Sequence, residues 1–326
     1  MKIQTTTDQG LSTRTSSDAA AQSTAVSRVE SSYFRPRWLL YRCLQHAFGN
    51  RAAWLLLAAI GGSAALPPTR ALAAEKSSPA AVANTCCAVV ELRQYTLHPG
   101  QRDVLIDLFN RKFIEPQEAV GIRVIGQFRD KDNADRFVWL RGFSDMPARA
   151  EALKSFYYGD LWKANRSAAN ATIIDNDNVL LLHPARADSG FAAATNPRVA
   201  ADSIDIPKGF VIANLYYFDT PASADFLDFF EHTLKPEFIH NGATILGSFV
   251  SEHSANTFPA LPVREGENVF VWFSLFADES AYEQYLVALE KSAPWRDRIK
   301  PALLPRLKKA PEVLRLTPTA RSQIHA

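Results

Sequence analysis

Apolar and polar positions alternate with a period of two near residue 90 and then change to a helical period. Over about residues 88–97, Glu91, Arg93 and Tyr95 fall on one face of a predicted strand, because side chains in a strand point alternately to its two sides. From about 102 to 119, apolar residues recur at helical spacing, which predicts an amphipathic helix. Gly121 follows it, as is typical of a helix end. Further strands are predicted at about 122–129, 136–143 and 172–183, with a second helix from about 145 to 161.

The same succession occurs a second time. At an offset of 121 residues, Leu105–Phe109 falls on Phe226–Phe230; at an offset of 133, Phe137–Trp139 falls on Phe270–Trp272. The change of offset places an insertion, residues 253–267, in the second copy. Predicted strands of this copy cover about 210–218, 244–251, 268–276 and 312–317, with helices starting near Ser223, a plausible N-cap, and Ser280.

Each copy therefore has the order β-α-β-β-α-β, a ferredoxin-like arrangement. Such a unit covers one sheet face with its helices and leaves the other face in need of a partner. The predicted fold class is α+β: two ferredoxin-like units whose sheets close face to face into an intramolecular dimeric α/β barrel. We expect the first unit over 88–185, a linker over 186–208, the second unit over 209–318 and a tail over 319–326.

The residues before the first unit have the order of a targeting sequence. Residues 1–30 are polar and predicted to be disordered, and 31–74 combine arginines, an apolar run of about 15 residues and small residues before a cleavage site near Ala73. This order favours export to the periplasm or outside the cell, after which no stable membrane span would remain. A mitochondrial transit peptide or an uncleaved membrane anchor is the alternative. Residues 75–87 form a linker.

Composition narrows the class of partner. The 326 residues carry a formal net charge of +2, and the absence of a long basic stripe argues against nucleic acid. Cys86 and Cys87 are adjacent, and because a disulfide needs a particular Cα separation we expect two free thiols. An intermolecular disulfide is the alternative. The sequence leaves open whether the chain is a monomer or a homo-oligomer.

The segment from Glu91 to Gly100, the following helix, the run 121–128 and Phe137–Trp139 together resemble the NIPSNAP family. The resemblance is strong over 88–185 and weaker over 209–318, where Ile212 and Asn214 replace the Glu and Arg of the opening motif. It implies the dimeric α/β-barrel superfamily, which includes cofactor-free monooxygenases and haem enzymes. Fold alone does not carry function.

Candidate ligand-binding residues come from the strand faces that we expect to point into the barrel. They are Arg93, Tyr95, Trp139, Arg141, Asn214, Tyr216 and Trp272. Aromatic rings and guanidinium groups together suit a planar or anionic small molecule. The alternative is structural: Glu91 and Arg93 pair with each other, and the aromatic side chains are ordinary core.

No catalytic residues can be assigned, and neither a metal site nor a cofactor is predicted. His232 and His240 are two helical turns apart, and one of them could ligate haem in the enzyme alternative. The sequence thus predicts an exported NIPSNAP-like protein that binds a small aromatic or anionic ligand or a protein partner. A cofactor-free monooxygenase or a haem-dependent enzyme that uses the barrel cavity is the alternative.

Overall fold

Eight strands form one closed antiparallel barrel, in the order β1-β3-β2-β8-β5-β7-β6-β4. The computed structural model describes residues 85–195 and 197–326. The predicted leader, targeting segment and cleavage site, and all of the 75–87 linker before Thr85, lie outside these residues. Among the described residues, no helix is long and apolar enough to cross a lipid bilayer.

The two halves of the described chain repeat one order of elements. The first unit contains β1 (Val89–Leu97), α1 (Arg102–Lys112), α2 (Ile114–Ala119), β2 (Arg123–Asp130), β3 (Arg136–Phe143), α3 (Met146–Tyr157), α4 (Asp160–Asn170) and β4 (Ile173–Pro184). The second contains β5 (Phe210–Tyr217), α5 (Ala224–Phe229), η1 (Phe230–Leu234), α6 (Lys235–His240), β6 (Thr244–Ser251), β7 (Val269–Phe276), α7 (Glu279–Lys291), η2 (Trp295–Ile299), α8 (Lys300–Leu303), η3 (Leu304–Arg306) and β8 (Glu312–Pro318). The predicted fold class, two ferredoxin-like units forming an intramolecular barrel, is confirmed.

Local sequence accounts for several boundaries. Asp145 and Asp278 occupy equivalent positions before α3 and α7, and each side chain accepts a hydrogen bond from the backbone N–H three residues later. Ser223 caps α5 in the same way, as predicted. Gly121 has a φ of 91°, a left-handed conformation that glycine adopts at little cost.

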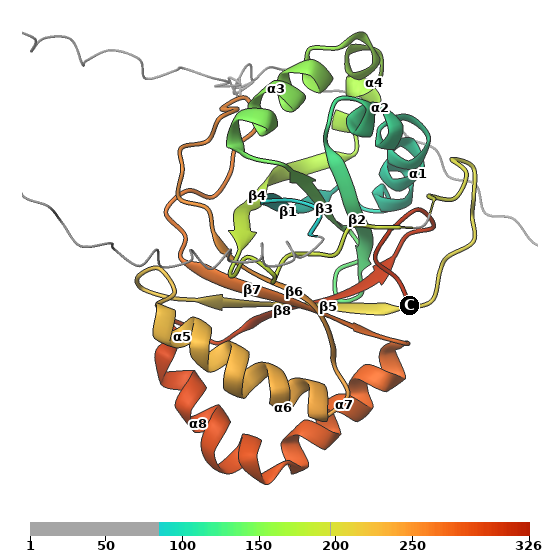
Figure 1. The fold of residues 1–326 in the computed structure, drawn as a ribbon. Coiled ribbons are helices and arrows are strands. Elements are labelled where there is room, and N and C mark those ends of the chain that lie inside the picture. The colour runs from blue at the N-terminus through green and yellow to red at the C-terminus, as the bar shows by residue number, and fades with distance from the viewer. Residues whose placement is uncertain (1–84, 196) are drawn as a thin grey trace, which may run out of the picture. The chain divides into compact units, whose positions relative to one another are not determined.

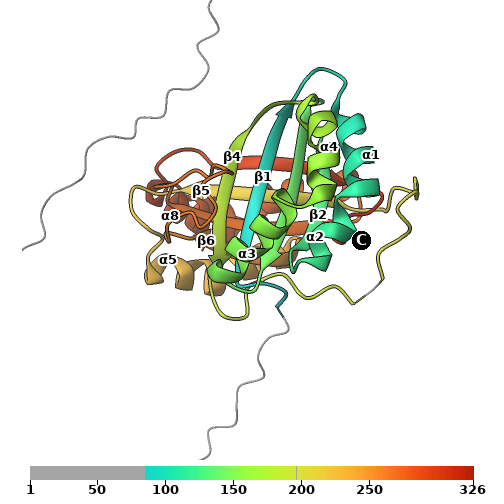
Figure 2. The same cartoon turned by 90° about the horizontal axis from the view of Figure 1, so that it is seen from above.

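The helices of the two units lie on opposite sides of the barrel. Figure 1 shows α1–α4 at the top and α5–α8 at the bottom, with the strands between them, and Figure 2 shows the same barrel from above. The units join where β2 pairs with β8 and β4 pairs with β6, for example at Phe128↔Pro318 and His183↔Val250. The barrel has no free strand edge as a result.

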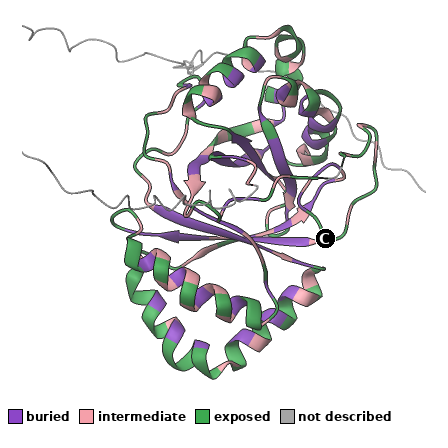
Figure 3. Cartoon of the chain, in the orientation of Figure 1, coloured by how far each residue is buried: buried purple, intermediate pink, exposed green. Residues whose placement is uncertain are grey.

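The barrel interior is filled by side chains from both units. One buried cluster joins Val90, Leu92, Val138 and Leu140 of the first unit to Val211, Leu215, Val271 and Phe273 of the second. Two further clusters lie between each sheet and its own helices. Figure 3 shows that most strand residues are buried, whereas the helices are exposed on their outer faces.

The prediction for the cysteines was wrong. Cys86 and Cys87 are joined by a disulfide across a single peptide bond. The usual Cα separation describes bridges between distant residues and does not exclude ring closure between neighbours. Cys87 is buried against Gly142, where an added Cβ would lie 2.3 Å from its sulfur, so glycine at position 142 makes room for the bridge.

Candidate functional site

The predicted inward face points outward, toward the helices. Tyr95 and Trp139 belong to the cluster between the first sheet and α1–α4, whereas Leu92 and Leu140, on the opposite faces of the same strands, face the barrel interior. The prediction that these aromatic and arginine side chains line a cavity inside the barrel was therefore wrong. In a closed barrel that is covered by helices both strand faces are buried, so hydrophobic alternation does not reveal which face is inside.

The candidate residues consequently separate into two groups. Arg93, Tyr95, Trp139 and Arg141 come together under the helices of the first unit. Tyr216 and Trp272 lie in the cluster of the second unit, where Trp272 stacks on Phe238 at 4.6 Å between ring centroids. Asn214 lies on the same strand as Tyr216 and is half-buried. The second unit's layer is thus an aromatic core at this position, as the structural alternative predicted.

A single buried carboxylate organises the charged residues of the first unit. Glu91 accepts hydrogen bonds from Arg93 at 2.6 Å, from Arg141 at 2.7 Å and from Arg149 at 2.7 Å, and all four side chains are fully buried. Burial by itself would raise the pKa of Glu91, but the three guanidinium groups outweigh it and hold that pKa well below its ordinary value. The Glu91–Arg93 pair of the structural alternative is present, but it is one part of a larger cluster.

This cluster has more positive than negative charge. One carboxylate faces three guanidinium groups, which leaves two positive charges without a buried counterpart within the cluster. The Nη2 atoms of Arg93, Arg141 and Arg149 each lack a hydrogen-bond partner among the described residues. Buried charges and buried donors are normally paired, so this cluster carries excess positive charge that its own residues do not compensate.

Two tyrosines connect the charge cluster to a neighbouring pocket. Arg93 donates to the hydroxyl of Tyr95 at 2.9 Å, and Arg141 donates to the hydroxyl of Tyr157 at 3.3 Å. Burial raises the pKa of Tyr95 despite the nearby Arg93, so its phenol stays protonated. Because each hydroxyl oxygen already accepts from an arginine, its own hydrogen is free to be donated to a third group.

The pocket has a volume of about 330 Å³, within the usual range for ligand sites of ~300–1,000 Å³. Its walls are mostly aromatic, and its polar groups are the side chains of Gln117, Arg166, Asn170 and Asn176 and the hydroxyls of its tyrosines. The lining residues include Tyr95, Phe109, Phe113, Gln117, Trp139, Phe156, Tyr157, Tyr158, Trp162, Phe258 and Leu261. Convergent polar groups in an apolar cavity are typical of small-molecule sites.

Sequence reasoning missed Arg149, Tyr157 and the role of the insertion. Arg149 shares a face of α3 with the buried residues Leu153 and Phe156. An arginine on an apolar helix face indicates a buried charge that needs a partner, so the sequence did contain a signal for this residue. Residues 253–267 gave no comparable signal, because the partners that reveal their role, Arg149 and Asn178, belong to the other unit.

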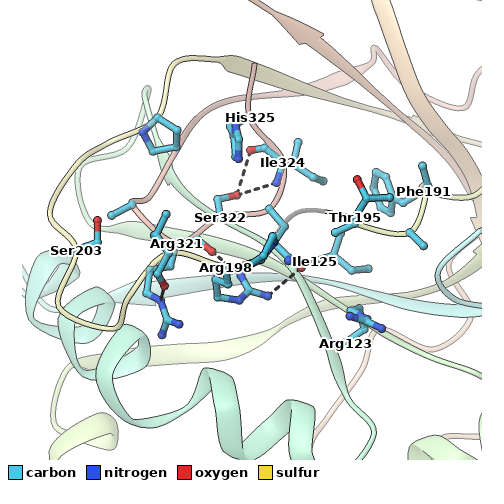
Figure 4. Close-up of a pocket in the computed structure, with 18 of the residues that line it drawn as sticks. Arg123, Ile125, Phe191, Thr195, Arg198, Ser203, Arg321, Ser322, Ile324 and His325 are labelled. Atoms are coloured by element: carbon cyan, nitrogen blue, oxygen red, sulfur yellow. Dashed lines mark hydrogen bonds between the residues drawn. The ribbon is translucent and has the colours of Figure 1, made fainter.

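A larger cavity of about 530 Å³ lies beneath the linker and the C-terminal tail. Figure 4 shows Arg198 and Arg321 in it. Arg198 donates to the carbonyl oxygens of Arg321 and Val124 and to Glu118, and Arg321 is held by Glu115 and by the carbonyl of Asn110. These arginines hold the linker and tail against the first unit and have their charge compensated there, unlike the cluster around Glu91.

The residues of the unit 1 pocket do not fit haem. Its lining contains no histidine, cysteine or methionine within the described chain, and tyrosine, the remaining usual axial ligand, binds iron as a phenolate that the raised pKa of Tyr95 disfavours. His232 and His240 are exposed and line a separate depression over η1 and α6.

The class of this protein follows from its architecture: a single-chain α/β barrel of two ferredoxin-like units. Residues 90–187 match the NIPSNAP family model, so the predicted resemblance is confirmed for the first unit. No curated protein matches the chain significantly.

Solved structures with a related fold are distant in sequence. A putative monooxygenase from Fusobacterium nucleatum covers 71% of this chain and 92% of its own, at 8% identity and a TM-score of 0.45. A putative monooxygenase from Lactobacillus acidophilus covers 71% of this chain and 93% of its own, at 14% identity and a TM-score of 0.41. A NIPSNAP family protein from Agrobacterium tumefaciens covers 29% of this chain and 91% of its own, at 21% identity and a TM-score of 0.28. At such identities and scores the likeness says nothing about activity.

Proposed function

We propose that the first unit binds a small planar molecule that carries an acidic oxygen, such as an aromatic carboxylate. The observation that carries the proposal is the excess of buried guanidinium charge directly behind an aromatic pocket. Aromatic walls favour a flat ring by stacking. The hydroxyl groups of Tyr95 and Tyr157, each backed by an arginine, supply donors for the acidic oxygen.

Loss of the Tyr157 hydroxyl should weaken binding of an anion more than binding of a neutral ring. We expect the full chain to bind benzoate more tightly than benzamide, and Tyr157→Phe to reduce benzoate affinity about 10-fold, the effect of a charge-assisted hydrogen bond of ~1.5 kcal/mol. Isothermal titration calorimetry, supported by the fluorescence of Trp139 and Trp162 in the pocket wall, measures both.

Tyr158→Phe is the matched control. Tyr158 lines the same pocket but is 62% exposed, so its hydroxyl should contribute little. Equal affinity for benzoate and benzamide, or equal losses in Tyr157→Phe and Tyr158→Phe, would contradict anion recognition by the arginine-backed phenols. If neither probe binds, the proposed function itself is wrong.

We also propose that the two units arose by internal duplication and that the protein is exported after cleavage near Ala73. The recurring residues at constant offset support the first point, and the order of basic, apolar and small residues supports the second. Intact mass of the exported chain should correspond to a start at Ala74. A start at Met1 or retention in the cell would contradict export with cleavage. Cofactor-free monooxygenase chemistry, which the sequence analysis placed in the barrel cavity, stays a prediction from the sequence.

A further inference from the structure

The insertion of the second unit runs past the neighbouring strand β4 to the pocket of the first unit. It occupies the connection between β6, which ends at Ser251, and β7, which begins at Val269. The equivalent connection between β2 and β3 is a short turn from Lys131 to Asp135. Phe258 and Leu261 of the insertion are buried in the cluster of the first unit, not in that of their own unit. The second unit therefore builds part of the first unit's site.

Two sets of hydrogen bonds fix the insertion in place. At its C-terminal end, the backbone N–H of Arg264 donates to the carbonyl of Val179 in β4 at 2.8 Å, and its side chain donates to Asn178 at 3.1 Å. In its middle, Arg149 donates to both Asn256 and Thr257 at 3.0 Å. Because Arg149 also donates to Glu91, the charge cluster and the insertion are held by one guanidinium group.

The side chains between these anchors form one wall of the pocket. Phe258, Ala260 and Leu261 line it. The Phe258 ring lies nearly parallel to that of Tyr157, with centroids 5.9 Å apart and an interplanar angle of 26°, and it also contacts Tyr158. Asn256 stiffens this turn, since it accepts from the N–H of Phe258 and donates to the carbonyl of Leu261.

We propose that the insertion determines ligand selectivity, with Phe258 and Leu261 setting the size of the ring system that the pocket admits beside Tyr157. This inference rests on the proposed function of the same pocket. Phe258 stands against Tyr157, one of the two phenols that face the acidic oxygen, so a ligand held by that phenol meets the Phe258 ring. A second fused ring that extends from Tyr157 toward the insertion would meet the side chains of Phe258 and Leu261.

The test compares benzoate with 2-naphthoate on the full chain and its variants. We expect the wild type to bind benzoate at least 10-fold more tightly, and Phe258→Ala to reverse or abolish that preference by raising 2-naphthoate affinity at least 10-fold. Leu261→Ala should shift the ratio in the same direction by a smaller factor, and it serves as a second variant if Phe258→Ala does not fold. Circular dichroism and thermal melting establish folding.

Val263→Ala is the matched control, because Val263 belongs to the insertion but does not line the pocket; its affinity ratio should equal that of the wild type. A folded Phe258→Ala or Leu261→Ala that weakens both ligands equally, or leaves their ratio unchanged, overturns selectivity while the proposed function stands. If the wild type binds neither acid, the proposed function fails, and this inference with it.

Discussion

Glu91→Gln should lower the free energy of unfolding by about 3–5 kcal/mol, the usual cost of removing one partner from a buried ion pair. The substitution preserves shape but leaves three fully buried guanidinium groups facing a neutral amide. Urea denaturation of the full chain at pH 7 measures the change. The control is Asp107→Asn, which breaks the exposed pair with Arg111 and should cost less than about 1 kcal/mol. Similar losses in both variants would contradict a central role for Glu91.

The difference in unfolding free energy between wild type and Glu91→Gln should depend on pH, which gives a second test of the role of Glu91. The pKa of Glu91 is lower in the folded protein than in the unfolded chain, where glutamate titrates at about 4.3. Its ionisation therefore stabilises the fold fully above that value, and the contribution is lost as the pH falls below it. The gap between wild type and Glu91→Gln should narrow progressively below about pH 4. A gap that stays constant between pH 7 and pH 2 would show that the ionised carboxylate is not its source.

Phe273→Ala should lower the free energy of unfolding by about 3–5 kcal/mol, because a large side chain is removed from a closely packed interior. Phe273 is fully buried inside the barrel and contacts Phe191 and Phe249, at 5.1 and 5.9 Å between ring centroids. Phe273→Leu keeps most of the volume and should cost less than about 2 kcal/mol. Chemical denaturation measures both, and a loss under about 1 kcal/mol in Phe273→Ala would mean that the barrel centre is not a packed core.

The architecture was readable from the sequence because it depends on local and recurring signals. Helical periodicity, the caps at Asp145 and Ser223 and the glycine after the first helix are each determined by neighbouring residues. Their recurrence placed the second unit, and the need of each sheet for a partner predicted the barrel. These inferences required no knowledge of which residues meet across the barrel.

The direction of the strand faces could not be obtained in the same way. In β1, polar residues at Glu91 and Arg93 suggested a functional interior, yet both they and the intervening Leu92 are fully buried. The polar face lies under the helices, where Arg149 on α3 donates to Glu91 and the hydroxyl of Tyr157 accepts from Arg141. Recognising that network requires residues 58 and 66 positions away from Glu91 to be placed in space.

The structural difference between the two units has a consequence for the stoichiometry of ligand binding. A barrel made from two identical chains would present two equivalent sites, and occupation of one could influence the other. Within residues 85–195 and 197–326, the buried cluster of Glu91 and its three arginines lies under the helices of the first unit, and the long β6–β7 connection reaches that side, whereas the equivalent β2–β3 connection is a short turn. Binding of the ligand should therefore follow a simple hyperbola, with one ligand molecule bound per polypeptide at saturation. Because the two units are fused into one chain, the second unit can support the barrel and supply one wall of the pocket without binding a ligand itself.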